Sequence, residues 1–298
     1  MKALAVEFRV SAICQVLGVS RSGYYDWLQR EPSARHLADR QLLALIVEAH
    51  SQSRQTYGSP RVAHALKQQN QRCGRHRVAR LMRQEGLRGV QKKAFRPRTT
   101  QSDHPLPIAP NRLKQSPAPR QPDEVWVSDI TYLLTGQGWL YLAAVMDLCS
   151  RKVVGWATAE HLKTTLVKEA LERALQTRRP APGLVHHSDR GIQYASHQYR
   201  QLLESHQIIP SMSAQGNCYD NASMESFFST LKSELIGRQS WSTHPELKLA
   251  IFDYVETFYN RKRLHSSLNY QSPNQFEEQH RRGLQQTAKA RPTTLCRN

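Results

Sequence analysis

Apolar residues recur every three to four positions in several short stretches of the first hundred residues, a spacing that is typical of amphipathic helices. Two such stretches lie within residues 10–30, on either side of a glycine, and Ser20 is placed to cap the second helix. Another helix is expected to begin at Ser59 and Pro60, and a further one to cover residues 75–85. The pattern therefore predicts an all-helical first region, with the outline of a helix-turn-helix over residues 10–30.

A different pattern begins near residue 125, where runs rich in β-branched and aromatic residues replace the helical spacing. Three such runs, at residues 125–134, 139–148 and 152–158, predict consecutive antiparallel strands. The elements predicted after them are a helix over 164–178, a strand over 183–189, a helix over 196–206, a strand over 208–213 and a helix over 221–235. The expected fold is therefore α/β, with one mixed five-stranded sheet flanked by helices.

Proline marks the main boundary in the chain. Seven of the 15 prolines fall within residues 97–122, where the missing amide donors favour extended backbone. We therefore expect a linker there, between a helical, helix-turn-helix-like DNA-binding region of residues 1–96 and an α/β domain of residues 123–237. The remaining residues, 238–298, are expected to form a basic helical extension.

The chain of 298 residues carries 42 Lys and Arg against 24 Asp and Glu, a formal net charge of +18, and the excess is confined to its flanks. Residues 1–125 have 22 basic and 9 acidic side chains and residues 236–298 have 10 and 5, whereas residues 126–235 have 10 of each. Basic flanks beside a neutral domain are typical of segments that hold nucleic acid near a central site. The candidate contacts in the densest basic stretch are Arg75, Arg77, Arg80, Arg83, Lys92 and Lys93.

Composition argues against several other classes of protein. The longest apolar run, residues 139–146, has eight residues, far fewer than the roughly 20 of a membrane helix. Glu7 and Arg9 interrupt the stretch in which a signal-peptide core would form. Five scattered cysteines favour neither a disulfide framework nor a zinc finger. We therefore expect a cytoplasmic protein without a membrane partner and without zinc.

Three carboxylate residues are candidates for a catalytic, metal-binding site. Asp129 lies within an otherwise apolar strand, Asp189 ends the buried strand that precedes Gly191, and Glu225 is in the first turn of the last predicted helix. A single aspartate in a strand is often only structural, but three such groups at one edge of a sheet would repel one another unless a cation lay between them. Carboxylate oxygens are the ligands that Mg²⁺ selects, and two such ions can promote an in-line phosphoryl displacement.

The segments around these carboxylates resemble a known family. Residues 126–132 (WVSDITY), 187–194 (HSDRGIQY) and 220–228 (DNASMESFF), with 35 residues between Asp189 and Glu225, are similar to the D, D-35-E signature of the retroviral-integrase-like transposases. More narrowly, residues 259–268 (YNRKRLHSSL) are similar to the C-terminal signature of the OrfB products of two-frame insertion sequences. Asn269 departs from the family pattern, which often has glycine there.

This resemblance implies a ribonuclease-H-like catalytic core in which Asp129, Asp189 and Glu225 are the catalytic residues and hold Mg²⁺ or Mn²⁺, two ions during catalysis. It implies nicking at transposon ends, followed by attack of the freed 3′-OH on another phosphodiester. The expected partners are DNA, as element ends and as target, and further copies of the chain on that DNA. By the same analogy, an upstream-frame product or a frameshift fusion is an expected partner, and the location is the bacterial cytoplasm, on the nucleoid when bound to DNA.

Further residues in these motifs are candidate DNA contacts. Lys232 lies seven residues after Glu225, so the two side chains share one face of the predicted helix. The alternative is a surface lysine that pairs with a neighbouring acid. Gln193 and Tyr194 either contact DNA or simply begin a loop. The remaining candidates are Asn217, in the polar stretch before the last helix, and Arg261, Arg263 and His265, in the C-terminal signature.

Two other functions remain compatible with the sequence. A ribonuclease-H-fold nuclease would use water alone as its nucleophile, whereas a transposase would also use a DNA 3′-OH. A second-frame product could also be a non-catalytic DNA-binding regulator of transposition, although the presence of all three carboxylates argues against a loss of catalysis. The leading interpretation is a DNA transposase that performs metal-dependent strand cleavage and transfer.

Overall fold

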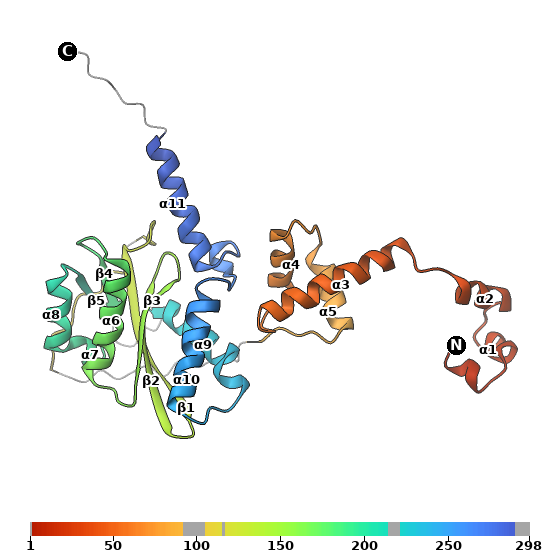
Figure 1. Ribbon diagram of the computed structural model, residues 1–298, viewed down its shortest axis with the longest axis horizontal. Helices are drawn as coiled ribbons and strands as arrows, with labels where there is room; N and C mark the ends of the chain where they lie inside the picture. The colour runs from red at the N-terminus through yellow and green to blue at the C-terminus, as the bar shows by residue number, and fades with distance from the viewer. Residues whose placement is uncertain (1, 92–104, 115–116, 214–220, 290–298) are drawn as a thin grey trace, which may run out of the picture.

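A central sheet of five strands, with helices on both faces, forms the body of the molecule in the computed structural model (Figure 1). The structure describes residues 2–91, 105–114, 117–213 and 221–289. The N-terminal helices extend away from the sheet on one side, and helix α11 (Pro273–Lys289) projects from it toward the C-terminus (Figure 1). None of the described helices is long and apolar enough to cross a membrane.

The sheet has the strand order β3-β2-β1-β4-β5, which confirms the predicted mixed topology. The antiparallel strands are β1 (Val125–Thr135), β2 (Gly138–Asp147) and β3 (Val153–Ala159), and the strands parallel to β1 are β4 (Val185–Ser188) and β5 (Ile209–Met212). β1 pairs with β2 along nearly its whole length, but with β4 only over Val125 to Val127. β1 therefore continues past the end of β4.

Alternate strand residues face two separate cores, because successive side chains in a strand point to opposite faces. Trp126 and Val145 face one core, whereas Val127 and Met146 face the other. The first core is covered by α6 (Thr164–Arg178), α7 (Ile192–Ala195) and α8 (His197–Ser205). The second core is covered by α9 (Ala222–Glu234), α10 (His244–Phe252) and a π-helix over Asp253–Tyr259.

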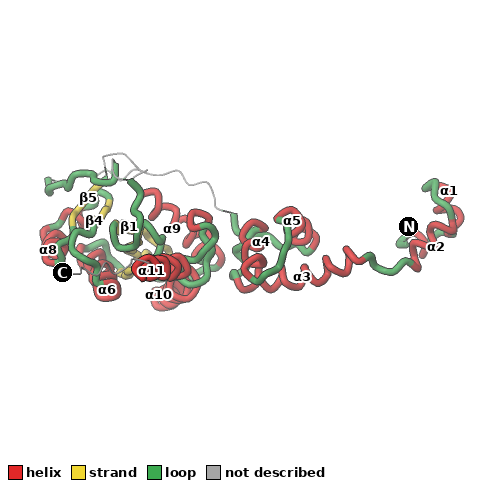
Figure 2. Tube along the Cα trace, turned by 90° about the horizontal axis from the view of Figure 1, so that it is seen from above, coloured by secondary structure: helices red, strands yellow, loops and turns green. Residues whose placement is uncertain are grey.

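The N-terminal region is all helical, as predicted, and it includes one long helix that the sequence pattern did not reveal. Its helices are α1 (Val10–Val16), α2 (Arg21–Gln29), α3 (Ala34–Gln52), α4 (Ser59–Gln68) and α5 (Arg75–Gln84). α1 and α2 lie apart from the rest, at the far end of the molecule (Figure 2). Ser20 caps α2, since its hydroxyl accepts a hydrogen bond from Gly23 N at 3.0 Å.

The apolar side chains of the α3–α5 unit form one continuous core with the sheet domain. Ile46, Val62 and Val78 are buried in the same continuous core as the α9 side of the sheet. Tyr57 anchors the connection, because its hydroxyl donates to Lys262 O at 3.2 Å and accepts from Leu264 N at 2.7 Å. The helical unit is therefore held by direct contacts with the C-terminal segment, in addition to its connection to the sheet domain through the linker.

Asn269 adopts the left-handed backbone conformation, with φ 52° and ψ 39°. Glycine adopts this conformation most easily, and asparagine tolerates it better than most other residues. The local turn therefore forms although Asn269 departs from the glycine of the family pattern.

Candidate active site

Asp129 and Asp189 lie at the same level on neighbouring strands. β1 and β4 are parallel, and the last residues paired between them are Val127 and His187. Asp129 and Asp189 each follow two residues later in the chain. Both are only partly exposed, at the edge where β1 continues past the end of β4. Parallel pairing therefore brings two of the three predicted carboxylates together.

Helix α9 brings the third carboxylate to the same strand. The buried Asn221 precedes α9, and its Nδ2 donates a 3.2 Å hydrogen bond to Ser128 O, next to Asp129. Glu225 follows in the first turn of the helix. Arg151, in the turn between β2 and β3, donates a hydrogen bond to Ser223 Oγ at the start of the same helix. The sequence pattern predicted neither anchor, and its only signal for Asn221 was a polar residue directly before a helix.

Burial and the neighbouring carboxylates disfavour ionisation of Asp129. Burial and the charge of Asp189 raise the pKa of Asp129 to about 8, and Glu225 contributes in the same direction. The amide of Ile130, which donates to Asp129 Oδ1 at 2.8 Å, opposes this shift. Burial also raises the pKa values of Asp189 and Glu225. Asp129 therefore lies within electrostatic reach of both other carboxylates.

The chemistry of the donor set fits a hard divalent cation, because carboxylate oxygens are the ligands that such ions select. Oδ1 of Asp129 accepts from Ile130 N, and Oδ1 of Asp189 accepts from Gly191 N at 2.9 Å. Among the described residues, no hydrogen bond involves the second oxygen of either aspartate. As the side chains stand, no three Asp, Glu, His or Cys residues in the described part of the chain form a metal site.

Two buried histidines hold the strand that leads to Asp189. His186 Nε2 lies 2.9 Å from Ser128 Oγ and 3.1 Å from Tyr199 OH, and burial lowers the pKa of His186 to about 3. His187 lies between Ser211 and Ser213, with ring nitrogens 2.9 and 3.1 Å from their hydroxyls. Both rings therefore fix β4 against its neighbours on either side.

Tyr194 is 3% exposed, so little of its side chain is accessible to DNA in this structure, and its DNA contact stays a prediction. Helix α7 directs its ring into the core, where the ring centroids of His186 and Tyr199 lie 6.5 and 5.4 Å away. Gln193 is half-buried, and its Nε2 donates to Leu162 O at 3.0 Å. A DNA contact by Gln193 stays a prediction.

Lys232 lies on the same side of α9 as the carboxylates. Its Nζ is 5.0 Å from the centroid of the Tyr132 ring, which is itself exposed at the end of β1. Burial lowers the pKa of Lys232, whereas the charge of Asp129 raises it. The ammonium group is therefore within electrostatic reach of the candidate site.

The other basic residues predicted to contact DNA differ in the exposure of their side chains. Arg77 and Arg80 bind Asp39 of α3 at 2.7 and 2.5 Å, so they hold α5 against α3. The exposed candidates are Arg75, Arg83 and Arg261. The candidates that lie outside the described residues are Lys92, Lys93 and Asn217. DNA contacts by all of these residues stay predictions.

Arg263 is 3% exposed, so its guanidinium is not accessible to DNA in this structure, and its DNA contact stays a prediction. Its Nε and Nη2 donate to the two carboxylate oxygens of Glu234 at 2.8 and 2.7 Å, and Tyr254 OH donates to the same carboxylate at 2.8 Å. This buried ion pair fastens the C-terminal segment to the end of α9. His265 is half-buried, with its ring edge-on to that of Tyr259 at 4.8 Å, and its DNA contact stays a prediction.

Comparisons with known proteins agree with this architecture. An HTH-like domain model matches residues 36–95, and Integrase core domain models match residues 119–218 and 225–280. The HTH-like match covers α4, α5 and most of α3, so it leaves out the helix-turn-helix outline predicted at residues 10–30.

The chain is 46% identical over 268 residues to the insertion element IS600 uncharacterized 31 kDa protein of Shigella sonnei, an alignment that covers 90% of this chain and 98% of the relative. It is 40% identical over 273 residues to the transposase InsF for insertion sequence IS3A of Escherichia coli strain K12, covering 91% and 94%. The HTLV-2 integrase catalytic core domain in complex with magnesium is 15% identical, with a TM-score of 0.40, and the alignment covers 53% of this chain and 98% of that one.

Proposed function

The chain belongs to the family of IS3-type insertion-element transposases, and we propose that it uses Asp129, Asp189 and Glu225 to cut element ends and join the freed 3′-OH to target DNA. The observation that supports these residues most is the common level of Asp129 and Asp189 beyond the last pair of β1 and β4. Burial, together with repulsion from Asp189 and Glu225, raises the pKa of Asp129. Such a cluster favours a bound cation.

The cation we propose is Mg²⁺ or Mn²⁺, with two ions during catalysis, held by the three carboxylates. Bound ions of this kind activate the attacking oxygen and stabilise the leaving oxygen. The chain itself orients the ligands, since the amides of Ile130 and Gly191 each fix one aspartate oxygen and leave the other for the metal. Glu225, in the first turn of α9, is the third proposed ligand.

Lys232 is proposed to contact the DNA backbone next to the reacting phosphate. It is within electrostatic reach of Asp129, and an ammonium group there offsets the repulsion between DNA and the carboxylates. Lys232→Ala should therefore reduce strand transfer about tenfold, whereas Lys232→Arg should retain most of it, because a phosphate contact needs charge more than shape. If Lys232→Ala performed strand transfer at the parental rate in physiological salt, the proposed contact between Lys232 and the DNA backbone would be wrong.

The basic flanks are proposed to hold DNA while the central domain reacts with it. In this proposal, residues 1–96 form a DNA-binding region, 97–122 a linker, 123–237 the catalytic core and 238–298 a basic extension. We further propose a homo-oligomer on the DNA, an upstream-frame product or frameshift fusion as partner, and action on the nucleoid in the bacterial cytoplasm.

The test is a reaction of the purified chain, alone and fused to the upstream-frame product, with labelled duplexes that carry the ends of its own element. With Mg²⁺ we expect a nick at the element end and a second, larger product in which that end is joined to target DNA. A pre-nicked end that terminates in a 3′-dideoxy nucleotide is the matched control, because it lacks the attacking hydroxyl and should not be joined.

The same reaction distinguishes the alternatives. Cleavage without any joined product, from hydroxyl and dideoxy ends alike, would identify a nuclease on the same fold. Specific binding of element ends with neither reaction, by the chain and by the fusion, would identify a regulator of transposition.

A further inference from the structure

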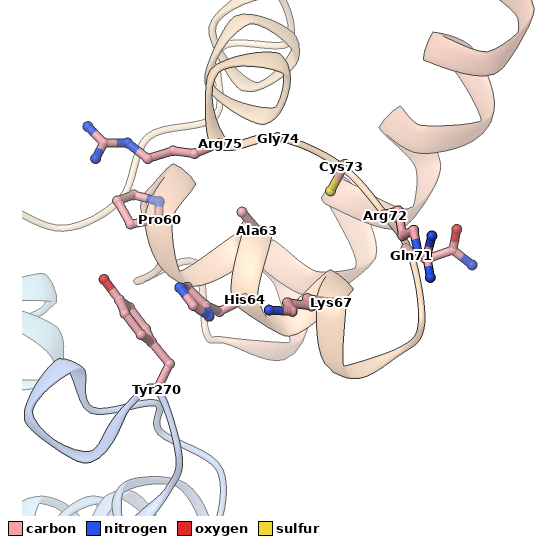
Figure 3. A pocket seen from close by; sticks show the side chains of 10 residues that line it. All are labelled: Pro60, Ala63, His64, Lys67, Gln71, Arg72, Cys73, Gly74, Arg75 and Tyr270. Carbon is pink, nitrogen blue, oxygen red and sulfur yellow. The ribbon is translucent and has the colours of Figure 1, made fainter.

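A basic cavity lies at the junction of α4, the loop that leads to α5, and the C-terminal segment (Figure 3). Its volume is about 790 Å³. Lys67, Arg72 and Arg75 contribute three cations to its lining, and His64 and Tyr270 contribute two rings, whereas no carboxylate belongs to the lining among the described residues. In Figure 3, Arg72 and Arg75 lie at opposite ends of the loop that passes over α4. A cavity lined in this way favours an anion.

Two parts of the chain that are far apart in sequence form the cavity. The rings of His64 on α4 and Tyr270 in the C-terminal segment stack at 3.7 Å with an interplanar angle of 8°. Gln68 Nε2 also donates to Tyr270 O at 3.1 Å. Tyr270 has a φ of 58°, a conformation that an aromatic residue rarely adopts and that persists only where surrounding contacts fix it. The cavity therefore has one fixed wall that is not part of the HTH-like unit.

The beginning of α5 adds to the positive potential of the cavity. Gly74, which lines the cavity, is the N-cap of this ten-residue helix, and no side chain caps it. The first turn of α5 contains no acidic residue. The first backbone N–H groups of a helix carry partial positive charge and interact favourably with anions. The lining of the cavity thus combines three side-chain cations with an uncapped helix end.

We propose that this cavity binds a phosphodiester of the DNA backbone, at a site separate from the three carboxylates. A contact with the DNA backbone does not depend on the base sequence, so the phosphate can come from an element end or from target DNA. DNA bound there would contact the HTH-like unit and the C-terminal segment at once, across the His64 and Tyr270 stack. The proposal rests on the proposed function only in taking DNA as the ligand.

Gly74 offers a test in which the fold is preserved. A Cβ at Gly74 would meet nothing within 4 Å, and φ −80° and ψ 145° suit an ordinary N-cap residue. Gly74→Asp and Gly74→Asn have nearly the same shape and both cap helices well, so neither should lower the thermal unfolding temperature. We expect Gly74→Asp to weaken duplex binding about tenfold in fluorescence anisotropy, and Gly74→Asn to bind within about twofold of the parent, because only aspartate opposes a phosphate. Equal affinities for the two variants would overturn the proposal.

A second pair of variants tests the phosphate contact through the salt dependence of DNA affinity. Lys67→Gln with Arg72→Gln removes two cations from the cavity, and Lys163→Gln with Lys168→Gln removes two from the beginning of α6 in the core. Each lost phosphate contact flattens the log-log dependence of affinity on salt by about 0.9, so we expect a change of about 0.9 for the cavity pair, which contacts one phosphodiester, and a smaller one for the control pair. Equal changes for the two pairs would show a general charge effect and overturn the site.

The source of the phosphate is tested with two duplexes of equal length, one an element end and one unrelated. A backbone site predicts the same loss of affinity for both, and a loss confined to the element end would show base recognition instead. Because all these measurements record binding, they can succeed or fail independently of nicking by the parent chain, which tests the proposed function.

Discussion

Replacement of Arg263 by methionine should destabilise the fold strongly, because it leaves a buried carboxylate without its main partner. Arg263 is 3% exposed and Glu234 6% exposed, and two hydrogen bonds of 2.8 and 2.7 Å join them. Removal of one member of a buried ion pair costs about 3–5 kcal/mol. Glu234 would keep the Tyr254 hydroxyl at 2.8 Å and Arg61 at 4.0 Å, so we expect the lower end, about 3 kcal/mol.

Urea unfolding followed by tryptophan fluorescence measures this loss. The double variant Arg263→Met with Glu234→Leu provides the control, because it removes the stranded carboxylate as well and should recover 1 kcal/mol or more, on the order of typical couplings between contacting residues. The salt dependence of DNA binding, measured in parallel, should not change. If Arg263→Met instead unfolds at the parental urea concentration and flattens the salt dependence by about 0.9, the residue is a phosphate contact and the assigned role of the buried pair is wrong.

Two further substitutions test the packing and the ion pairs around the sheet. Gly155→Ala should lower the free energy of unfolding by about 1–3 kcal/mol, because its Cβ would lie 2.3 Å from Ala170 O and 2.6 Å from Ala174 N and would push α6 off β3; Gly283→Ala, with open space around it, is the control, and equal urea midpoints would contradict the close approach. Burial raises the pKa of Glu277, but the hydrogen bond and charge of Arg178 outweigh this effect and leave the pKa below 4.5. The stability that the ionised Glu277 contributes is therefore present above about pH 4.5 and is lost as the pH falls through the lower pKa of the folded state. Glu277→Gln should therefore lose about 2 kcal/mol at pH 7 and show a weaker loss of stability below pH 4.5 than the parent, and equal acid sensitivity would refute this assignment.

The sequence predicted the sheet domain well, because its elements have simple periodic patterns. The helix expected over residues 164–178 has those bounds in the structure, and the strands of the sheet differ from their predicted bounds by two residues at most. The convergence of Asp129 and Asp189 was also predictable in outline, since Asp129 lies within one apolar strand and Asp189 ends another. Their common level depends on the parallel pairing of β1 with β4, which the sequence pattern does not reveal.

The features that the sequence did not reveal depend mainly on contacts between residues distant in sequence. Arg263 looked like part of a basic surface, but Glu234, which lies 29 residues earlier, pairs with it in the core. Tyr194 looked accessible because the short helix α7 was not expected, and that helix turns its ring inward. α3 was missed because its apolar residues do not form one stripe, with Leu42 and Ile46 buried but Leu37 and Val47 exposed.

Cleavage of element-end DNA by single carboxylate variants tests the central claim most directly. Asp129→Asn, Asp189→Asn and Glu225→Gln keep the size of each side chain and remove the charge that would hold the cation. At protein concentrations that saturate the DNA, so that the basic flanks bind equally in every variant, each substitution should abolish Mg²⁺-dependent nicking while DNA affinity stays within about twofold of the parent. Substantial Mg²⁺-dependent nicking by any one of the three variants would contradict the assignment of that residue to the active site.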